Sequence, residues 1–132
     1  MMKKKNFTTT VLVLTVLLAV GLACTGYGTK LDFNNGELYY TDNVTETDAK
    51  KLGDYLVKEG FFNGKKITVQ LDKSGSTYQF RMVVMPEKQN DEPTLLLMKA
   101  FAGQISEDVF DNAPTELHIC DDQLKTVKVL KP

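Results

Sequence analysis

The sequence predicts an α+β fold, a two-layer sandwich in which an antiparallel sheet of three hairpins carries two helices on one face. Three observations predict it. Three segments alternate apolar and polar residues on both sides of a turn signal, two segments repeat apolar residues at helical spacing, and their order is ββαββαββ. The inner part of this order is the β-α-β-β-α-β series of ferredoxin-like folds. The 132 residues allow a single domain.

Residues 1–23 are typical of an export signal. Lys3, Lys4 and Lys5 form a basic start, and an apolar run from 11 to 23 follows, interrupted only by Thr15. This run is shorter than the roughly 18 to 20 residues that span a bilayer. We therefore expect a signal peptide at 1–23, a linker at 24–29 and one domain at 30–132, with an uncleaved anchor as the alternative.

The end of the signal contains a cysteine in a distinctive setting. Val20-Gly21-Leu22-Ala23-Cys24 resembles the lipobox of bacterial lipoproteins. The resemblance implies a diacylglyceryl group on the Cys24 thiol, cleavage before Cys24 and acylation of the new amine. Several acyl chains make such an anchor firm. Thr25 in the next position implies transport to the outer membrane in a two-membrane bacterium, and ordinary secretion to the periplasm or medium is the alternative.

Charge and cysteine content change when the signal is removed. Loss of its three lysines lowers the Lys and Arg count from 16 to 13 against 17 Asp and Glu, so the mature chain has a net charge of −4. A mildly acidic chain with mixed charges gives no reason to expect a nucleic-acid partner. A lipid on Cys24 also leaves Cys120 without an intramolecular disulfide partner.

The first hairpin is predicted at 30–40, with Asn35-Gly36 as its turn. This turn places Phe33 opposite Leu38 and Leu31 opposite Tyr40, with all four on one face. The preceding linker of five residues reaches only about 17 Å when extended. The domain is therefore expected to lie close to the membrane.

The first helix is predicted to begin after Thr45, with Asp48 completing a capping box, and to stop at Gly60. Its apolar stripe consists of Ala49, Leu52, Leu56 and Val57.

The second hairpin is predicted at 66–72 and 77–85, joined around Ser74-Gly75. The predicted register pairs Ile67 with Met82, Val69 with Phe80, and Leu71 with Tyr78.

The second helix is predicted from Pro93 to about Phe110. The leucine and methionine run at 95–98 is assigned to the core, and the stripe continues through Leu97, Phe101, Ile105 and Val109. The last segment, 115–130, is predicted as two strands around Asp121-Asp122. Its alternation slips once, which indicates a bulge or a longer turn.

Most of the mature chain also resembles an uncharacterised bacterial domain that recurs at the C-terminal end of membrane-associated proteins. The resemblance rests on NGELYY, VTETDAKKLGDYLVKEGFF, VQLDKSGSTYQFRMVV and APTELHICDDQLKTVKV. It implies an accessory module and brings no activity or site.

His118-Ile119-Cys120 is the one place where two reactive side chains share a strand face. Such a pair has the residue types of a nucleophile with its base, or of part of a metal site. Catalysis requires a third orienting group, and the chain has no second histidine. We expect ordinary strand residues, no enzyme activity, no cofactor and no metal, with a small thiol-dependent enzyme using Cys120 and His118 as the alternative.

The remaining candidate is a surface. The helix-free face of the sheet is predicted to be flat and polar, and it is the expected partner-binding face: Asp32, Tyr39, Thr68, Gln70, Thr77, Gln79, Arg81 and His118. The outer strands are a second possible contact, with a partner edge or another copy of the domain. The sequence thus predicts a lipid-anchored, non-enzymatic envelope protein that binds another protein. A secreted ligand-binding domain is a further alternative, with the predicted core packing arguing against it.

Overall fold

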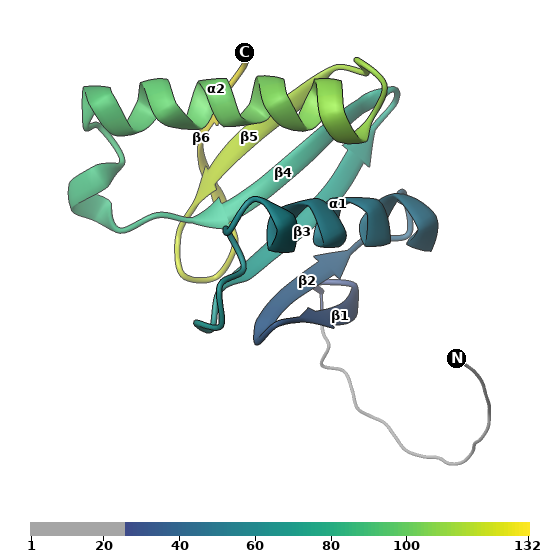
Figure 1. The fold of residues 1–132 in the computed structure, drawn as a ribbon. Helices are drawn as coiled ribbons and strands as arrows, with labels where there is room; N and C mark the ends of the chain where they lie inside the picture. Colours follow the sequence, from purple (N-terminus) through teal and green to yellow (C-terminus); the bar gives the residue numbers. More distant parts are fainter. Residues whose placement is uncertain (1–25) are drawn as a thin grey trace.

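The computed structural model describes residues 26–132, so the predicted export signal and Cys24 lie outside the described residues. The chain forms a sheet with two helices, and Figure 1 shows both helices on the same face of that sheet. The α+β class is confirmed. The elements are β1 (Thr29–Phe33), β2 (Gly36–Tyr40), α1 (Glu46–Lys58), β3 (Thr68–Ser74), β4 (Thr77–Val83), the 3-10 turn η2 (Pro86–Lys88), α2 (Glu92–Val109), β5 (Thr115–Cys120) and β6 (Thr126–Leu130).

The six strands follow one another across the sheet in chain order, and the sheet is mixed. β1–β2, β3–β4 and β5–β6 are antiparallel, but β2–β3 and β4–β5 are parallel. The expectation of a wholly antiparallel sheet is therefore wrong. A helix returns the chain to the end where the preceding strand began, so the next strand runs parallel to it. Each helix joins directly adjacent strands, so the split arrangement of ferredoxin-like folds is not confirmed.

The first hairpin turns one residue earlier than predicted. Asn34 and Asn35 both have positive φ, 50° and 70°, as a two-residue hairpin turn of this type requires. Phe33 therefore pairs with Gly36, and Leu31 pairs with Leu38. Gly36 is needed for packing, because a Cβ there would overlap the ring of Phe62. Moving the turn by one residue changes each residue's cross-strand partner by two positions. Every side chain therefore stays on its predicted face of the sheet.

The second hairpin is displaced in the opposite direction and turns one residue later than predicted. Gly75, with φ of +60°, begins the turn, and Ser74 pairs with Thr77. Val69 therefore lies opposite Met82 and Leu71 opposite Phe80. Again the predicted partners are wrong and the predicted faces are correct.

Both helices begin at capped ends. The Thr45 side chain accepts a hydrogen bond from the Asp48 backbone N–H at 3.1 Å, which confirms the predicted cap of α1. The Asp91 side chain caps α2 in the same way through Thr94. Val57 and Leu97 were assigned to the core, but they are 39% and 73% exposed.

The core lies between the helices and one sheet face. Its largest fully buried side chains include Phe62, Phe80, Leu52, Leu71 and Ile105. The ring of Phe61, from the loop after α1, lies 5.7 Å from that of Phe101 on α2 and 5.9 Å from that of Phe80 on β4. The aromatic side chains thus join the two helices to the middle of the sheet. Neither helix in the described part of the chain is both long and apolar enough to cross a bilayer.

Candidate functional site

The register places all eight side chains of the predicted binding face on the helix-free side of the sheet. Tyr39, Gln70, Arg81 and His118 are successive cross-strand neighbours and form one row across β2 to β5. Gln79 lies in the next row, opposite Asp72 on one side and Glu116 on the other. Asp32 and Thr68 lie in the adjacent row on the other side, where both pair with Glu37, and Thr77 lies two rows away at the start of β4.

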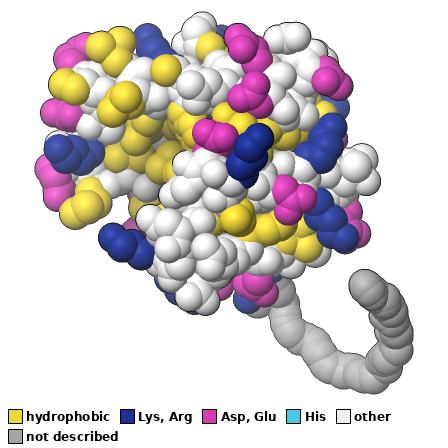
Figure 2. Space-filling model, viewed as in Figure 1, with side chains coloured by type: hydrophobic (Ala, Val, Ile, Leu, Met, Phe, Trp, Pro, Cys, Tyr) yellow, Lys and Arg dark blue, Asp and Glu magenta, His cyan; other side chains and the backbone are white. Residues whose placement is uncertain are grey.

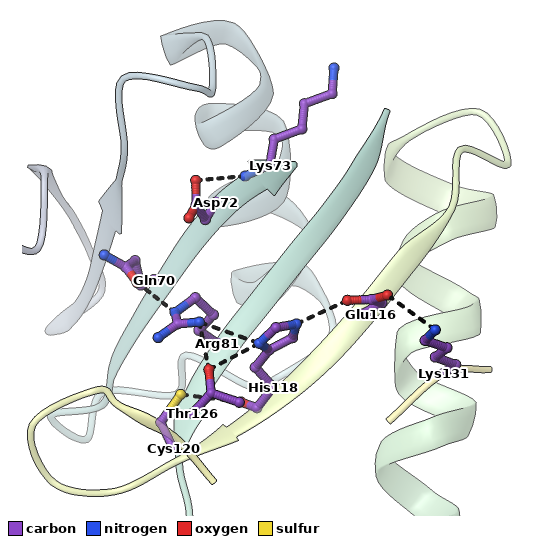
Figure 3. A network of polar contacts seen from close by, with 9 residues as sticks. All are labelled: Gln70, Asp72, Lys73, Arg81, Glu116, His118, Cys120, Thr126 and Lys131. Atoms are coloured by element: carbon purple, nitrogen blue, oxygen red, sulfur yellow. Dashed lines mark hydrogen bonds and ion pairs between the residues drawn. The ribbon is translucent and has the colours of Figure 1, made fainter. Parts of the chain in front are cut away.

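Arg81 is the centre of a polar network in this row (Figure 3). Its guanidinium donates from Nε to Gln70 Oε1 at 2.7 Å, from one terminal nitrogen to Thr126 Oγ1 at 2.7 Å, and from the other to the Leu124 carbonyl at 2.6 Å. A guanidinium uses five N–H donors in a fixed plane. Arg81 therefore ties β3, β4, the β5–β6 loop and β6 together within the molecule.

His118 continues the network toward the end of the sheet. Its Nδ1 lies 3.3 Å from an Arg81 terminal nitrogen and 3.0 Å from the Thr126 hydroxyl oxygen. Nε2 lies 3.0 Å from Glu116 Oε1 and carries the proton that this carboxylate accepts. Lys131 Nζ lies 3.9 Å from the other Glu116 oxygen. Both ring nitrogens of His118 thus have intramolecular partners, which fix the orientation of the ring.

The helix-free face is neither flat nor fully exposed. Tyr27 lies across it, because its carbonyl accepts from Gln70 Nε2 at 2.8 Å and its ring packs edge-on against Tyr39 at 5.6 Å. From the other side, Leu124 covers the row and is only 6% exposed. Gln70 and His118 are consequently buried. The predicted flat surface is replaced by two hollows of about 490 and 350 Å3, both lined by Tyr27 and Leu124.

Carboxylates beside these hollows are held in the charged form. Burial alone would raise the pKa of Asp72, but hydrogen bonds from Thr41, the Lys73 backbone and Asn43 outweigh it and lower the pKa. Glu37 is similar, because the hydrogen bonds of Thr68 and Lys66 outweigh its burial and lower its pKa. Both carboxylates are thus engaged by groups of the same molecule.

Cys120 shares the face of His118, as predicted, but its thiol is fully buried and free. The sulfur lies 3.5 Å from the His118 backbone carbonyl. Burial raises the pKa of the Cys120 thiol, which disfavours the thiolate. In residues 26–132 we find no group of three metal-ligating side chains. The pair is therefore poorly suited to nucleophilic chemistry.

An apolar groove lies on the opposite side of the sheet, along α2 from Thr94 to Gln104. It has a volume of about 450 Å3 and is lined by Phe61, Met82, Thr94, Leu97, Met98, Ala100, Phe101 and Gln104. Leu96 and Leu97 are 64% and 73% exposed. Figure 2 shows apolar side chains gathered over this end of α2 and in the hollow below it. The volume falls in the range of ligand-binding pockets.

Comparison with known proteins identifies the domain. The model of the AF_1994_N family, described as a family N-terminal domain, matches residues 30–131. The chain belongs to this family. No curated protein and no solved structure matches it. The match to the AF_1994_N domain is consistent with the expected small uncharacterised domain, although its description gives an N-terminal position where the resemblance implied a C-terminal one.

Sequence reasoning missed the groove of the AF_1994_N domain. It assigned the run at 95–98 to the core, but four successive helical residues point around most of the helix. Some of them therefore had to face solvent, and Leu96 and Leu97 do. The length of the apolar run at 95–98 was therefore a sequence signal that part of it is exposed. The covering of the helix-free face by Tyr27 and Leu124 had no comparable signal, because it depends on two loops that are distant in sequence.

Proposed function

We propose that the chain is a lipid-anchored protein of the bacterial cell envelope that binds another protein without catalysing a reaction. The contact we assign to it is the apolar groove beside α2, with an amphipathic helix of the partner as its occupant. The observation that carries this proposal is the exposure of Leu96 and Leu97 beside a groove lined mainly by apolar side chains.

The groove has the chemistry of helix recognition. Helix-in-groove contacts use apolar anchors at intervals of three and four residues, which enter an apolar furrow. Met82 and Met98 line the groove, and methionine side chains adapt to anchors of different shape. Thr94 and Gln104 are polar groups that can fix the orientation of a bound helix. The helix-free face is a weaker candidate, because Gln70, Arg81 and His118 are engaged within the molecule.

The anchor proposal rests on the lipobox-like segment ending at Cys24. The short linker would keep the domain near the bilayer, in the outer membrane if the cell has two. An alkyne-bearing fatty acid fed to producing cells tests it. We expect labelled wild-type and Cys120→Ala chains and an unlabelled, unprocessed Cys24→Ala chain. Labelling of the Cys24→Ala chain, or an intact unmodified N-terminus in the wild type, would contradict lipidation.

A small apolar ligand is the second candidate occupant, because a groove of about 450 Å3 also suits such a molecule. Native mass spectrometry of the purified chain distinguishes the two. A stoichiometric small molecule that is lost in the Leu97→Asp variant would favour a ligand carrier over a protein-binding module. The thiol-enzyme alternative has less support, since Cys120 is buried and the pKa of its thiol is raised.

A further inference from the structure

β1 is one of the two edges of the sheet in the described part of the chain. Lys30 and Asp32 on this strand are exposed, and their side chains point to the helix-free side. Leu31 lies between them on the core side and is partly buried. An edge strand with unpaired backbone groups is a template for pairing with another strand.

The backbone groups of this edge that face away from β2 belong to Lys30 and Asp32. On β2, the N–H groups of Glu37 and Thr41 donate to Ile67 and Leu71, on the side of β3. The alternation along a strand therefore directs Leu38 and Tyr40 toward β1, where they pair with Leu31 and Thr29. Lys30 and Asp32, at the intervening positions, direct their N–H and C=O groups away from the sheet.

We propose that two copies of the chain associate through β1, antiparallel, about a two-fold axis that passes beside Leu31. This register places Lys30 opposite Asp32 of the second copy, and Asp32 opposite Lys30 of the second copy. Each of these two pairs exchanges both backbone hydrogen bonds and brings opposite charges together. Leu31 meets Leu31 of the second copy at the closer, non-hydrogen-bonded position, which extends the apolar layer under the helices.

The other edge, β6, does not offer this complementarity. Residues 125–131 contain Lys125, Lys128 and Lys131 and no acidic residue. Pairing β6 with a second copy of β6 would bring positively charged lysines close together. Lysines on an edge strand commonly prevent such pairing. Of the two sheet edges within residues 26–132, β1 alone is complementary to itself, so the association closes at two copies.

The geometry of this dimer suits a shared membrane. A two-fold axis that pairs antiparallel strands in one sheet is perpendicular to the sheet, so both helix-free faces point the same way. Tyr27 lies on the helix-free face of its own copy, where its carbonyl accepts from Gln70. Both chains therefore enter their domains from the same side. The dimer itself does not depend on the anchor or on the groove.

Charge reversal on β1 tests the proposal with the full-length chain in detergent micelles, by sedimentation at several protein concentrations. Lys30→Glu and Asp32→Lys should each weaken dimerisation by at least about tenfold, because each replaces two attractive pairs by two repulsive ones. The double swap Lys30→Asp with Asp32→Lys should restore it to within about twofold. Lys128→Glu on β6 is the matched control and should change nothing.

A disulfide tests the register independently. Leu31→Cys should form an intermolecular disulfide under mild oxidation in intact membranes, while the wild type with Cys24 and Cys120 should not. A monomeric wild-type chain, single reversals without effect, failure of the double swap to rescue, or failure of Leu31→Cys to cross-link would each overturn the proposal. So would open-ended oligomers that Lys128→Glu disrupts, because they would indicate head-to-tail pairing of β1 with β6.

Discussion

Gly53, in the middle of α1, leaves the space that the ring of Phe33 on β1 occupies. A Cβ on Gly53 would overlap this ring. The helix thereby approaches the first strand closely and holds the edge of the sheet in place. Gly103, in α2, has different surroundings, since the nearest atom to a Cβ there is Pro132 Cβ at 3.7 Å.

The two glycines should respond in opposite ways to the same substitution. Gly53→Ala overpacks the contact with Phe33 and should lower the free energy of unfolding by about 1–3 kcal/mol. Gly103→Ala places a better helix former without a clash and should raise it by about 0.5–1 kcal/mol. Urea denaturation followed by circular dichroism measures both. Shifts of the same sign would contradict the close approach of α1 to β1.

Arg81 should be a stability residue. Arg81→Met keeps the apolar stem but removes the donors to Gln70, Thr126 and the Leu124 carbonyl. We expect a loss of about 2–4 kcal/mol in the free energy of unfolding, because charged hydrogen bonds are lost and acceptors stay unpaired. Gln79→Ala, on the same strand and face, is the control and should change stability by about 0.5 kcal/mol or less. Equal effects of the two variants would argue against the network.

Alkaline pH should destabilise the fold through Tyr78. Burial and the hydrogen bond to Asp48 at 2.6 Å raise the pKa of Tyr78 to about 12. An unfolded tyrosine has a pKa near 10, so between pH 10 and 12 the native state keeps a proton that the unfolded state has lost. Stability therefore falls with rising pH in this window, by up to about 1.4 kcal/mol per pH unit for one proton.

Tyr78→Phe tests this assignment. The variant should be less stable near neutral pH, by about 1 kcal/mol for the lost hydrogen bond, and should lose stability less steeply between pH 10 and 12. Burial and the hydrogen bond to Asp108 also raise the pKa of Tyr55 to about 12. Part of the fall in stability between pH 10 and 12 should therefore remain in the variant. An unchanged slope in Tyr78→Phe would show that Tyr78 does not titrate in this range.

Cys120 should be unreactive in the folded chain. The thiol is fully buried and burial raises its pKa, so alkylation by iodoacetamide at neutral pH should be at least about a hundredfold slower than in denaturant. Quantitative mass spectrometry of the Cys120 peptide measures the rate. Rapid labelling in native buffer would instead support a thiol-dependent activity with His118.

Much of the fold follows from sequence periodicity, and the errors have identifiable physical causes. Alternation placed Leu31, Phe33 and Leu38 on the correct face, and the predicted N-cap of α1 at Thr45 is confirmed. The turn of the first hairpin was misplaced because Gly36 serves the packing of Phe62, while the two preceding asparagines adopt positive φ. Turn residues and alternation therefore predict the sheet face of a side chain more reliably than its cross-strand partner.

The candidate site was less predictable. Strand alternation correctly put Arg81 and His118 on the helix-free side, but alternation cannot indicate that Tyr27 and Leu124 cover them. Conversely, the apolar run at 95–98 suggested core packing, and the structure exposes two of its leucines. Burial on each face depends on loops and on how far α2 extends over the sheet, and neither is a local property of the sequence.

Binding at the groove is tested most directly by site-specific photo-crosslinking in producing cells, with a photoreactive residue at Gln104, which lines the groove, or at exposed Lys99 on the same helix. We predict an adduct at Gln104 that is absent at Lys99 and is abolished by Leu97→Asp, a substitution at an exposed position that should leave the unfolding midpoint unchanged. Mass spectrometry of the adduct should identify a partner peptide with apolar residues at intervals of three and four. Equal adducts at the two positions, or an adduct at Gln104 that persists in Leu97→Asp, would contradict a protein-binding groove.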